Sequence, residues 1–275
     1  MTSFDPAALA REIKTVQDRG GELVPFSSRF ADFNLPSAYG VARRVHDLRL
    51  AEQALRVGRK IGFTNADMWD VYGVHAPVWG YIDDRTVVFD AGPTATCRIG
   101  RFAAPKIEPE IVVHFYRAPP ANANPAELLA CVDWVAHGIE IVQSHFPDWK
   151  FQAADTVADA ALHAALLVGT PCPVGNLGAN AMAAMAAMVD CEVSLSCNGQ
   201  LRDTGRGRNV LGGPLSAVAH LLKVIGEQAG AAPIAAGEIV TTGTLTQAHA
   251  VQVGQVWTTA FDGIALAGLR VEFID

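Results

Sequence analysis

Apolar residues recur at helical spacing over the first part of the chain. Residues 5–18 predict a short amphipathic helix, and the pair of glycines that follows predicts its end. A second, longer helix is expected over residues 36–57, because Pro-Ser opens it and Gly58 closes it. Its apolar positions are Val41, Val45, Leu48 and Ala51. The pattern therefore predicts a helical N-terminal segment over residues 1–58.

After residue 58 the pattern changes to short apolar runs interrupted by Gly, Pro and Asp, which indicates a mainly β body. Strands are expected at 60–63, 86–89, 94–99, 106–115, 137–142, 161–168, 191–197, 238–242, 255–261 and 268–273. Helices are expected at 125–136, 176–188 and 214–228. Asn198-Gly199 predicts a hairpin turn. Because strands and helices do not alternate strictly, a doubly wound parallel sheet is not favoured.

The expected strand 106–115 carries acidic residues close together at its start. Side chains two apart on a strand point to one face, about 6.5 Å apart at their roots, so Lys106, Glu108 and Glu110 should project together. Neighbouring carboxylates repel unless a proton or a cation lies between them. Pro109 cannot donate to a sheet ladder, which places the pair at a sheet edge or a bulge. A hard divalent metal is the simplest partner.

Glu140 is a natural third ligand, because it lies in another short apolar run with an isoleucine on each side. A carboxylate in such a strand needs a partner. The alternative is that Glu108 and Glu110 form an ordinary solvated face. The pattern alone leaves both interpretations open.

Composition narrows the class of protein. The chain has 275 residues, of which 50% are hydrophobic and 18% charged, so it can bury a sizeable core and disorder is not expected. The net charge of −7 argues against sequence-independent binding to nucleic acid or anionic membranes. The first residues lack the layout of a signal peptide, and the apolar stretches 160–168 and 181–189 are too short to cross a bilayer. We therefore expect a cytoplasmic protein.

Cysteine and histidine give no metal motif. The five cysteines are scattered without a Cys-x-x-Cys pair, which indicates buried thiols in a reducing compartment. None of the eight histidines forms His-x-x-x-His or His-Glu-x-x-His. His114, His137 and His145 lie near the acidic strands, and we interpret them as core or rim residues.

Six segments, in this order and spacing from about residue 37 onward, resemble the 2-keto-4-pentenoate hydratase and 4-oxalocrotonate decarboxylase family of the fumarylacetoacetase-like superfamily. They are 58–64, 106–110, 139–142, 155–159, 211–215 and 237–243. The resemblance implies an α+β fold with a mixed β-roll or sandwich catalytic body over residues 59–275, preceded by the helical segment. It also implies a metal-dependent lyase of aromatic compound degradation.

The resemblance further implies Mg²⁺ or Mn²⁺ held by Glu108, Glu110 and Glu140, which agrees with the carboxylate pattern. Such an ion leaves coordination positions open for a 2-oxo acid, which chelates through its keto oxygen and carboxylate, and the cation stabilises the resulting enolate. Lys60 matches the active-site lysine of the family. Near a dication and partly desolvated, it should have a lowered pKa and transfer a proton.

Four further residues are carried over from the same resemblance. Asp159 would orient Lys60 or a bound water, and Asp155 is a weaker candidate for that task. Thr242 and Thr244 would lie against the substrate carboxylate.

The chain also departs from the family pattern. Val78 stands where the hydratases carry an acidic residue, which looks more like the decarboxylases, whereas Ile61 and residues 155–156 look more like the hydratases. Ala160 replaces an expected Asn and His145 an expected Arg. An altered substrate would be consistent with these changes.

Two activities are therefore the main candidates for this protein. A hydratase adds water to a 2-hydroxy-2,4-dienoate after ketonisation, and a 4-oxalocrotonate-type decarboxylase uses the same metal site without attacking water. Hydrolytic cleavage of a carbon–carbon bond and an oxaloacetate-type decarboxylation are weaker possibilities. A different class is a catalytically silent partner subunit. The small-molecule 2-oxo acid is the expected ligand, and a homo-oligomer, associated with a sister pathway enzyme, is the expected assembly.

Overall fold

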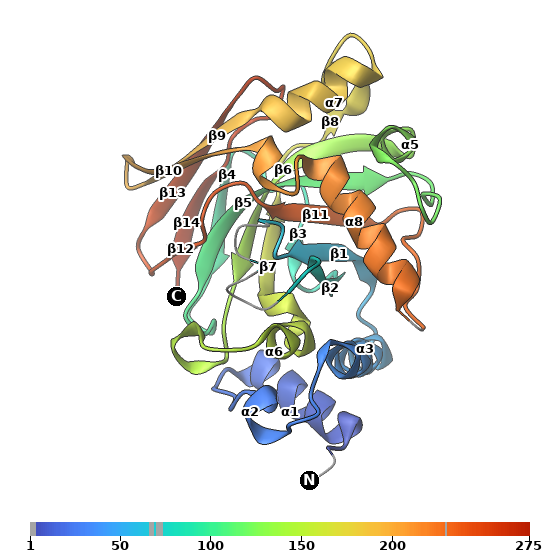
Figure 1. The fold of residues 1–275 in the computed structure, drawn as a ribbon. Helices are drawn as coiled ribbons and strands as arrows, with labels where there is room; N and C mark the ends of the chain where they lie inside the picture. Colours follow the sequence, from blue (N-terminus) through green and yellow to red (C-terminus); the bar gives the residue numbers. More distant parts are fainter. Residues whose placement is uncertain (1–3, 66–68, 70–73, 229) are drawn as a thin grey trace.

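The computed structural model describes residues 4–65, 69, 74–228 and 230–275, which form two β-sheets with helices around them (Figure 1). The larger sheet has the strand order β2-β1-β11-β5-β6-β7-β3, with β12 beside β5 and β8 beside β6. Its strands are β1 (Arg56–Gly62), β2 (Val78–Asp83), β3 (Val87–Val88), β5 (Lys106–Phe115), β6 (Val132–Val142), β7 (His163–Val168), β8 (Cys172–Pro173), β11 (Ile239–Thr244) and β12 (His249–Ala250).

The second sheet has the order β10-β9-β13-β14-β4. Its strands are β4 (Thr94–Arg98), β9 (Glu192–Cys197), β10 (Gln200–Arg206), β13 (Val256–Asp262) and β14 (Arg270–Ile274). The α-helices are α1 (Pro6–Arg19), α2 (Phe26–Arg29), α3 (Leu35–Ala51), α5 (Pro125–Leu129), α6 (Ala153–Ala158), α7 (Ala181–Asp190) and α8 (Pro214–Glu227). Short 3₁₀ turns follow β6, α6, β8 and β10. The expected α+β class is confirmed.

The larger sheet curls into a roll. Val112 of β5 packs in one buried cluster with Ile82 of β2 and Leu166 of β7, although β2 and β7 lie toward opposite ends of the strand order. Only a curved sheet brings such strands together. Because side chains alternate along a strand, Glu108 and Glu110 share this inner face with Val112. The outer face of β5 packs on the second sheet at Ile107 and on α8 farther along.

Helix α1 lies close to its predicted range, whereas α3 begins near its predicted start and ends earlier. The Asp5 side chain accepts a hydrogen bond from the backbone of the first turn of α1, and Gly20, with φ of 77°, ends this helix. The helices α1 and α3 pack side by side below the sheets (Figure 1). Their core includes Val142 and Val157 of the main body. The division after residue 58 falls inside β1 and stays a prediction.

Two expected helices are too long. The helix expected over 125–136 ends at Leu129, and residues 132–136 belong to β6, because pairing with β5 along its whole length outweighs local helix propensity. Helix α3 ends at Ala51, and Gln53 just beyond it has a φ of 67°, which an α-helix cannot contain. Strands β2, β8, β10 and β12 were not expected. The Asn198-Gly199 hairpin is confirmed, with both residues at positive φ between β9 and β10.

One helical run among the described residues, Gly207–Glu227, is long and apolar enough to cross a membrane by length and composition. Half of its most apolar 18-residue stretch is buried inside the protein. A core helix gives the same result, so this run is weak grounds for a membrane span.

Candidate metal centre and active site

Strand β5 places two of the three glutamates, and its partner β6 places the third. Glu108 pairs with Glu140 across the strands. Glu110 lies two residues further along β5, opposite Gly138. One carboxylate oxygen from each glutamate lies within 4.8 Å of the others. Glu110 and Glu140 are fully buried and Glu108 is half-buried. The predicted convergence of the three carboxylates is therefore present in the structure.

Pro109 was expected at a sheet edge or a bulge, and it lies beside a bulge. Strand β5 lies in the middle of the sheet, between β11 and β6, and not at an edge. The irregularity lies in β11, where the register shifts between Thr241 and Thr244. The carbonyl of Pro109 accepts a hydrogen bond from Leu245 on that side, so the N–H that proline lacks would also face the bulge. The bulge thus accommodates the proline and the glutamates together.

Gly243, inside this bulge, holds one of the glutamates. Its backbone N–H donates to Glu110 Oε2 at 2.8 Å. Its φ is 97°, and a Cβ there would lie 2.0 Å from Thr64 Oγ1, so only glycine fits. The other oxygen, Glu110 Oε1, is buried without a hydrogen-bond partner. A buried carboxylate oxygen with an unused lone pair fits a cation ligand.

The electrostatics of the cluster also favour a cation. Burial, together with the charge of Glu140 and against that of Lys60, raises the pKa of Glu108 to about 7. Burial and the charges of both other glutamates raise the pKa of Glu110 well above its usual value. For Glu140, burial is outweighed by the Lys60 charge and a hydrogen bond from His163, which lower its pKa to about 2. A divalent ion would replace the protons that this crowding otherwise retains.

Lys60 projects from β1 into the same cluster. It is 3% exposed, and its Nζ forms an ion pair with Glu140 Oε2 at 3.2 Å. The angles at this contact are not those of a hydrogen bond, so Glu140 Oε2 has no hydrogen-bond partner. Burial alone lowers the pKa of Lys60, but the charges of Glu140, Glu108 and Glu110 outweigh it and raise the pKa. The lowered pKa expected for Lys60 therefore requires a cation that neutralises these carboxylates.

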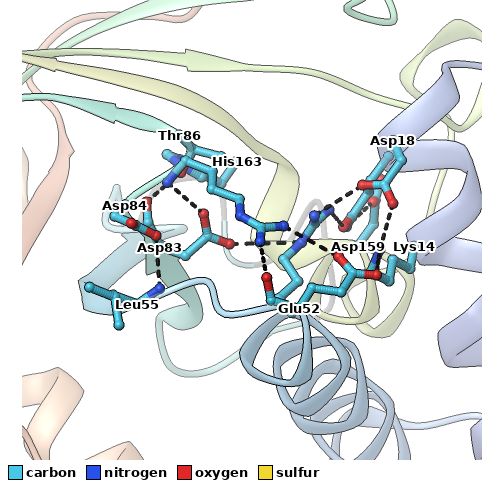
Figure 2. A network of polar contacts seen from close by, with 12 residues as sticks. Lys14, Asp18, Glu52, Leu55, Asp83, Asp84, Thr86, Asp159 and His163 are labelled. Atoms are coloured by element: carbon cyan, nitrogen blue, oxygen red, sulfur yellow. Dashed lines mark hydrogen bonds and ion pairs between the residues drawn. The ribbon is translucent and has the colours of Figure 1, made fainter.

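His163, at the start of β7, is a contact that the sequence did not indicate. Its Nδ1 donates to Glu140 Oε1 at 2.7 Å. Its Nε2 lies 2.9 Å from Thr86 Oγ1, and Figure 2 shows His163 beside Thr86. The contact of Nδ1 engages Oε1 of Glu140, and the other oxygen, Oε2, faces Lys60. The residue has no motif around it and depends on the pairing of β6 with β7, so only the three-dimensional structure reveals it.

The two aspartates lie elsewhere. Asp159 Oδ2 accepts from His145 Nδ1 at 2.7 Å, and Oδ1 accepts from Gln17 of α1. Asp155 accepts from the backbone and hydroxyl of Ser27. Neither aspartate lines the cavity around Lys60. These contacts join the N-terminal helices to α6 and do not favour the catalytic roles expected for the pair, which stay predictions.

The two threonines differ from each other. Thr242 is fully buried, and its hydroxyl donates to the carbonyl of Ile111. Thr244 lines the cavity, with its hydroxyl bonded to the carbonyl of Thr246. Only Thr244 is therefore placed to meet a bound molecule.

A cavity of about 400 Å³ opens beside the glutamates. Its charged lining residues are Lys60, Lys106 and Glu108. Its apolar walls include Ile61, Val78, Val142, Phe151 and Leu162. A volume of this size, mostly apolar with a few convergent polar groups, suits a small organic acid.

The match to the family model named fumarylacetoacetate (FAA) hydrolase C-terminal covers residues 70–272, and the chain belongs to this family. The chain is 32% identical, over 74% of its length and 88% of the relative, to a 2-hydroxypent-2,4-dienoate hydratase of Pseudomonas putida. It is 29% identical to a 2-keto-4-pentenoate hydratase of Paraburkholderia xenovorans, over 99% of the chain and 96% of the relative.

Among solved structures, the protein is similar to a 4-oxalocrotonate decarboxylase from Pseudomonas putida G7 complexed with magnesium and adipate. The TM-score is 0.88 at 25% sequence identity, and each chain is covered completely. The same decarboxylase complexed with calcium and acetate has a TM-score of 0.87. The predicted family and fold are thus confirmed.

We expect His163 to orient Glu140 for a metal. His163→Leu should lower Mg²⁺ affinity about 10- to 100-fold, because a ligand that loses its orienting hydrogen bond binds metal less well. His163→Asn should retain more affinity, because its amide can donate from nearly the position of Nδ1. Calorimetric titration with Mg²⁺ measures both, with His75→Leu at an exposed position as control. Unchanged affinity in His163→Leu would contradict the assignment.

Proposed function

We propose that the protein is a divalent-metal-dependent lyase that hydrates a 2-hydroxy-2,4-dienoate, as a 2-keto-4-pentenoate-type hydratase. The convergence of Glu108, Glu110 and Glu140 beside Lys60, at the end of a cavity sized for a small acid, supports the proposal most directly. The names of the relatives that align with almost the whole chain point in the same direction.

The three glutamates would hold Mg²⁺, or Mn²⁺ as an alternative, since hard cations prefer carboxylate oxygens. When bound, this ion supplies a Lewis acid that polarises the 2-oxo group of the substrate. Lys60, with its ammonium against Glu140, is the group placed to move a proton to or from the substrate carbon chain. The apolar walls at Ile61 and Leu162 orient the chain of the acid.

A 4-oxalocrotonate-type decarboxylase is the second candidate, and Val78 is the observation that favours it. The residue is 3% exposed and forms part of the cavity wall, where an acidic residue would assist water addition. An apolar wall provides no such group but suits the loss of a carboxylate. A catalytically silent partner subunit remains the candidate outside enzymes. Cytoplasmic location, homo-oligomerisation and association with a sister pathway enzyme belong to the same proposal.

The test supplies Mg²⁺ with 2-hydroxypenta-2,4-dienoate and follows loss of ultraviolet absorbance. In parallel, 4-oxalocrotonate is supplied and released CO₂ is measured. Hydration of the first compound supports the hydratase, and CO₂ release without hydration supports the decarboxylase. A protein that binds Mg²⁺ but turns over neither compound would contradict both activities and favour the silent subunit.

Val78→Asp should raise the rate of hydration relative to decarboxylation at least about tenfold, because a positioned carboxylate can serve as acid or base toward water. Val78→Ala, which enlarges the cavity without adding a charge, separates the effect of volume from that of the acid. The ratio of hydrated product to CO₂ is the measurement. An unchanged ratio in Val78→Asp would remove this position from the choice between the two reactions.

A further inference from the structure

A second cavity, of about 350 Å³, lies between the N-terminal helices and the roll. It shares no lining residue with the cavity beside the glutamates. Residues 161–162 line the first cavity, and their neighbours Ala160 and His163 line the second. His163 faces Glu140 with Nδ1 and faces Thr86, a lining residue of the second cavity, with Nε2. The second cavity therefore lies behind the metal centre and is separate from it.

Most charged side chains of this cavity are already paired with one another. Its acids and arginines are Asp18, Glu52, Asp83, Arg49, Arg85 and Arg101. Arg49 forms ion pairs with Asp18 and Asp83. Arg85 forms an ion pair with Glu52. Figure 2 shows this network around Asp18, Glu52 and Asp83, and it leaves none of the three acids without a cation.

Arg101 is the arginine of this cavity that the network does not use. Within the described part of the chain, no carboxylate lies within ion-pair distance of its guanidinium, which lies over the Phe102 ring at 5.7 Å from the centroid. Lys14 of α1 already adds a further cation to the paired acids Asp18 and Glu52. Arg101 also lies at the rim, because it lines the cavity and is exposed to solvent. Its charge is therefore available to an anion that enters from outside.

Gln143 supplies a second donor beside Arg101. The side chain is 6% exposed, and its Oε1 accepts from the backbone N–H of Ala103 at 3.1 Å. Because that N–H must meet an oxygen, the amide nitrogen points the other way. Nε2 has no hydrogen-bond partner in the described residues, yet it is not one of the atoms sealed off from solvent-accessible space. Since Ala103 is two residues from Arg101, both donors lie at one end of the cavity.

The remaining wall of the cavity is largely apolar. It includes Ala42, Val45, Phe102, Ala158, Ala160 and Ala164. A guanidinium fork and an amide N–H at one end suit a carboxylate, which only accepts hydrogen bonds. An apolar wall beyond them suits a short hydrocarbon chain and disfavours a fully hydrated inorganic anion.

We propose that this cavity is a second ligand site, in which Arg101 and Gln143 bind the carboxylate of a small organic acid. The chain of the acid lies against Val45 and Phe102. The site does not depend on the proposed function, because no residue of the metal centre lines it.

Equilibrium dialysis of the Mg²⁺-loaded protein against radiolabelled butyrate tests the proposal. Arg101→Met should weaken the binding of one butyrate per chain by about 10-fold or more, and Gln143→Leu should weaken the same butyrate by about 10-fold, because each removes a hydrogen bond to a charged group. Arg101→Lys should retain part of the affinity. Arg202→Met, at another exposed arginine, is the matched control.

Two comparisons assign the site and the class of ligand. Glu110→Gln should still bind this butyrate, whereas a butyrate held at the metal centre would be lost in that variant. Butyramide, which has the same chain without the charge, should bind at least about 10-fold more weakly than butyrate.

Equal butyrate binding by wild type and Arg101→Met would overturn the proposal, as would butyrate binding that disappears in Glu110→Gln alone. Inorganic phosphate that binds at Arg101 more tightly than butyrate would overturn the assignment to an organic acid. If circular dichroism shows that Arg101→Met does not fold, Gln143→Leu decides by the same comparison, and unchanged affinity there contradicts the site.

Discussion

Glu110→Gln is expected to abolish metal binding and turnover together. The amide keeps an oxygen for the Gly243 N–H but removes the charge, and with it the ligand oxygen that is buried without a partner. We expect Mg²⁺ affinity to fall by more than about 100-fold, beyond the 10- to 100-fold effect typical of groups that only orient a ligand. Turnover should fall by about 1000-fold or more, because the Lewis acid contributes several kcal/mol.

Stability provides an independent measurement of the same substitution. In wild-type protein, Mg²⁺ at 100 times its Kd should raise the free energy of unfolding by about 2.7 kcal/mol, and Glu110→Gln should lose this increase. Without Mg²⁺ the variant should be no less stable than wild type, because a crowded buried acid has been removed. Glu22→Gln, at an exposed position, is the control. Normal Mg²⁺-dependent stabilisation in Glu110→Gln would contradict the ligand assignment.

Lys60→Met should separate turnover from metal binding. Loss of a positioned proton-transfer group is expected to lower kcat about 10²- to 10⁴-fold. Mg²⁺ affinity should be retained or increased, because the variant removes a positive charge that lies 3.2 Å from a ligand oxygen of Glu140. The metal-free variant should lose about 3 kcal/mol of stability, since Glu140 is left buried without its cation.

Steady-state kinetics and Mg²⁺ titration check this prediction, with Lys150→Met as a matched control at the surface. If Lys60→Met retains wild-type kcat, Lys60 is not the proton-transfer group. If it loses Mg²⁺ binding as completely as Glu110→Gln does, the residue is needed for the metal centre itself.

The parts of the site that the sequence predicted are those that depend on local geometry. Glu108 and Glu110 are two residues apart on one strand, so their common direction follows from the alternation of side chains. Their meeting with Glu140 needs the pairing of β5 with β6, which an isolated acid in an apolar run indicated only indirectly. The contact of His163 with Glu140 depends on a second pairing and on a bulge, and nothing near His163 in the sequence indicates it.

The same distinction explains the fold. The strand expected at 106–115 matches β5 at both ends, because alternation of polar and apolar residues that leads into an apolar run is a local signal. Residues 132–136 satisfy a helical pattern as well as a strand pattern, and their partner strand decides between them. Pro109 indicated an edge or a bulge but not which of the two, because the bulge that accommodates the proline belongs to the neighbouring strand β11.

The contacts of Asp155 and Asp159 bear on how the polypeptide could be shortened. Both carboxylates are almost completely buried, and part of their hydrogen bonding comes from Ser27 and Gln17 in the leading helices. A version that starts at β1 would lose these donors and would also uncover the apolar core that Val142 and Val157 share with the leading helices. The N-terminal helices are therefore part of the folded unit, and their removal should destabilise α6 and the part of the roll that packs against it.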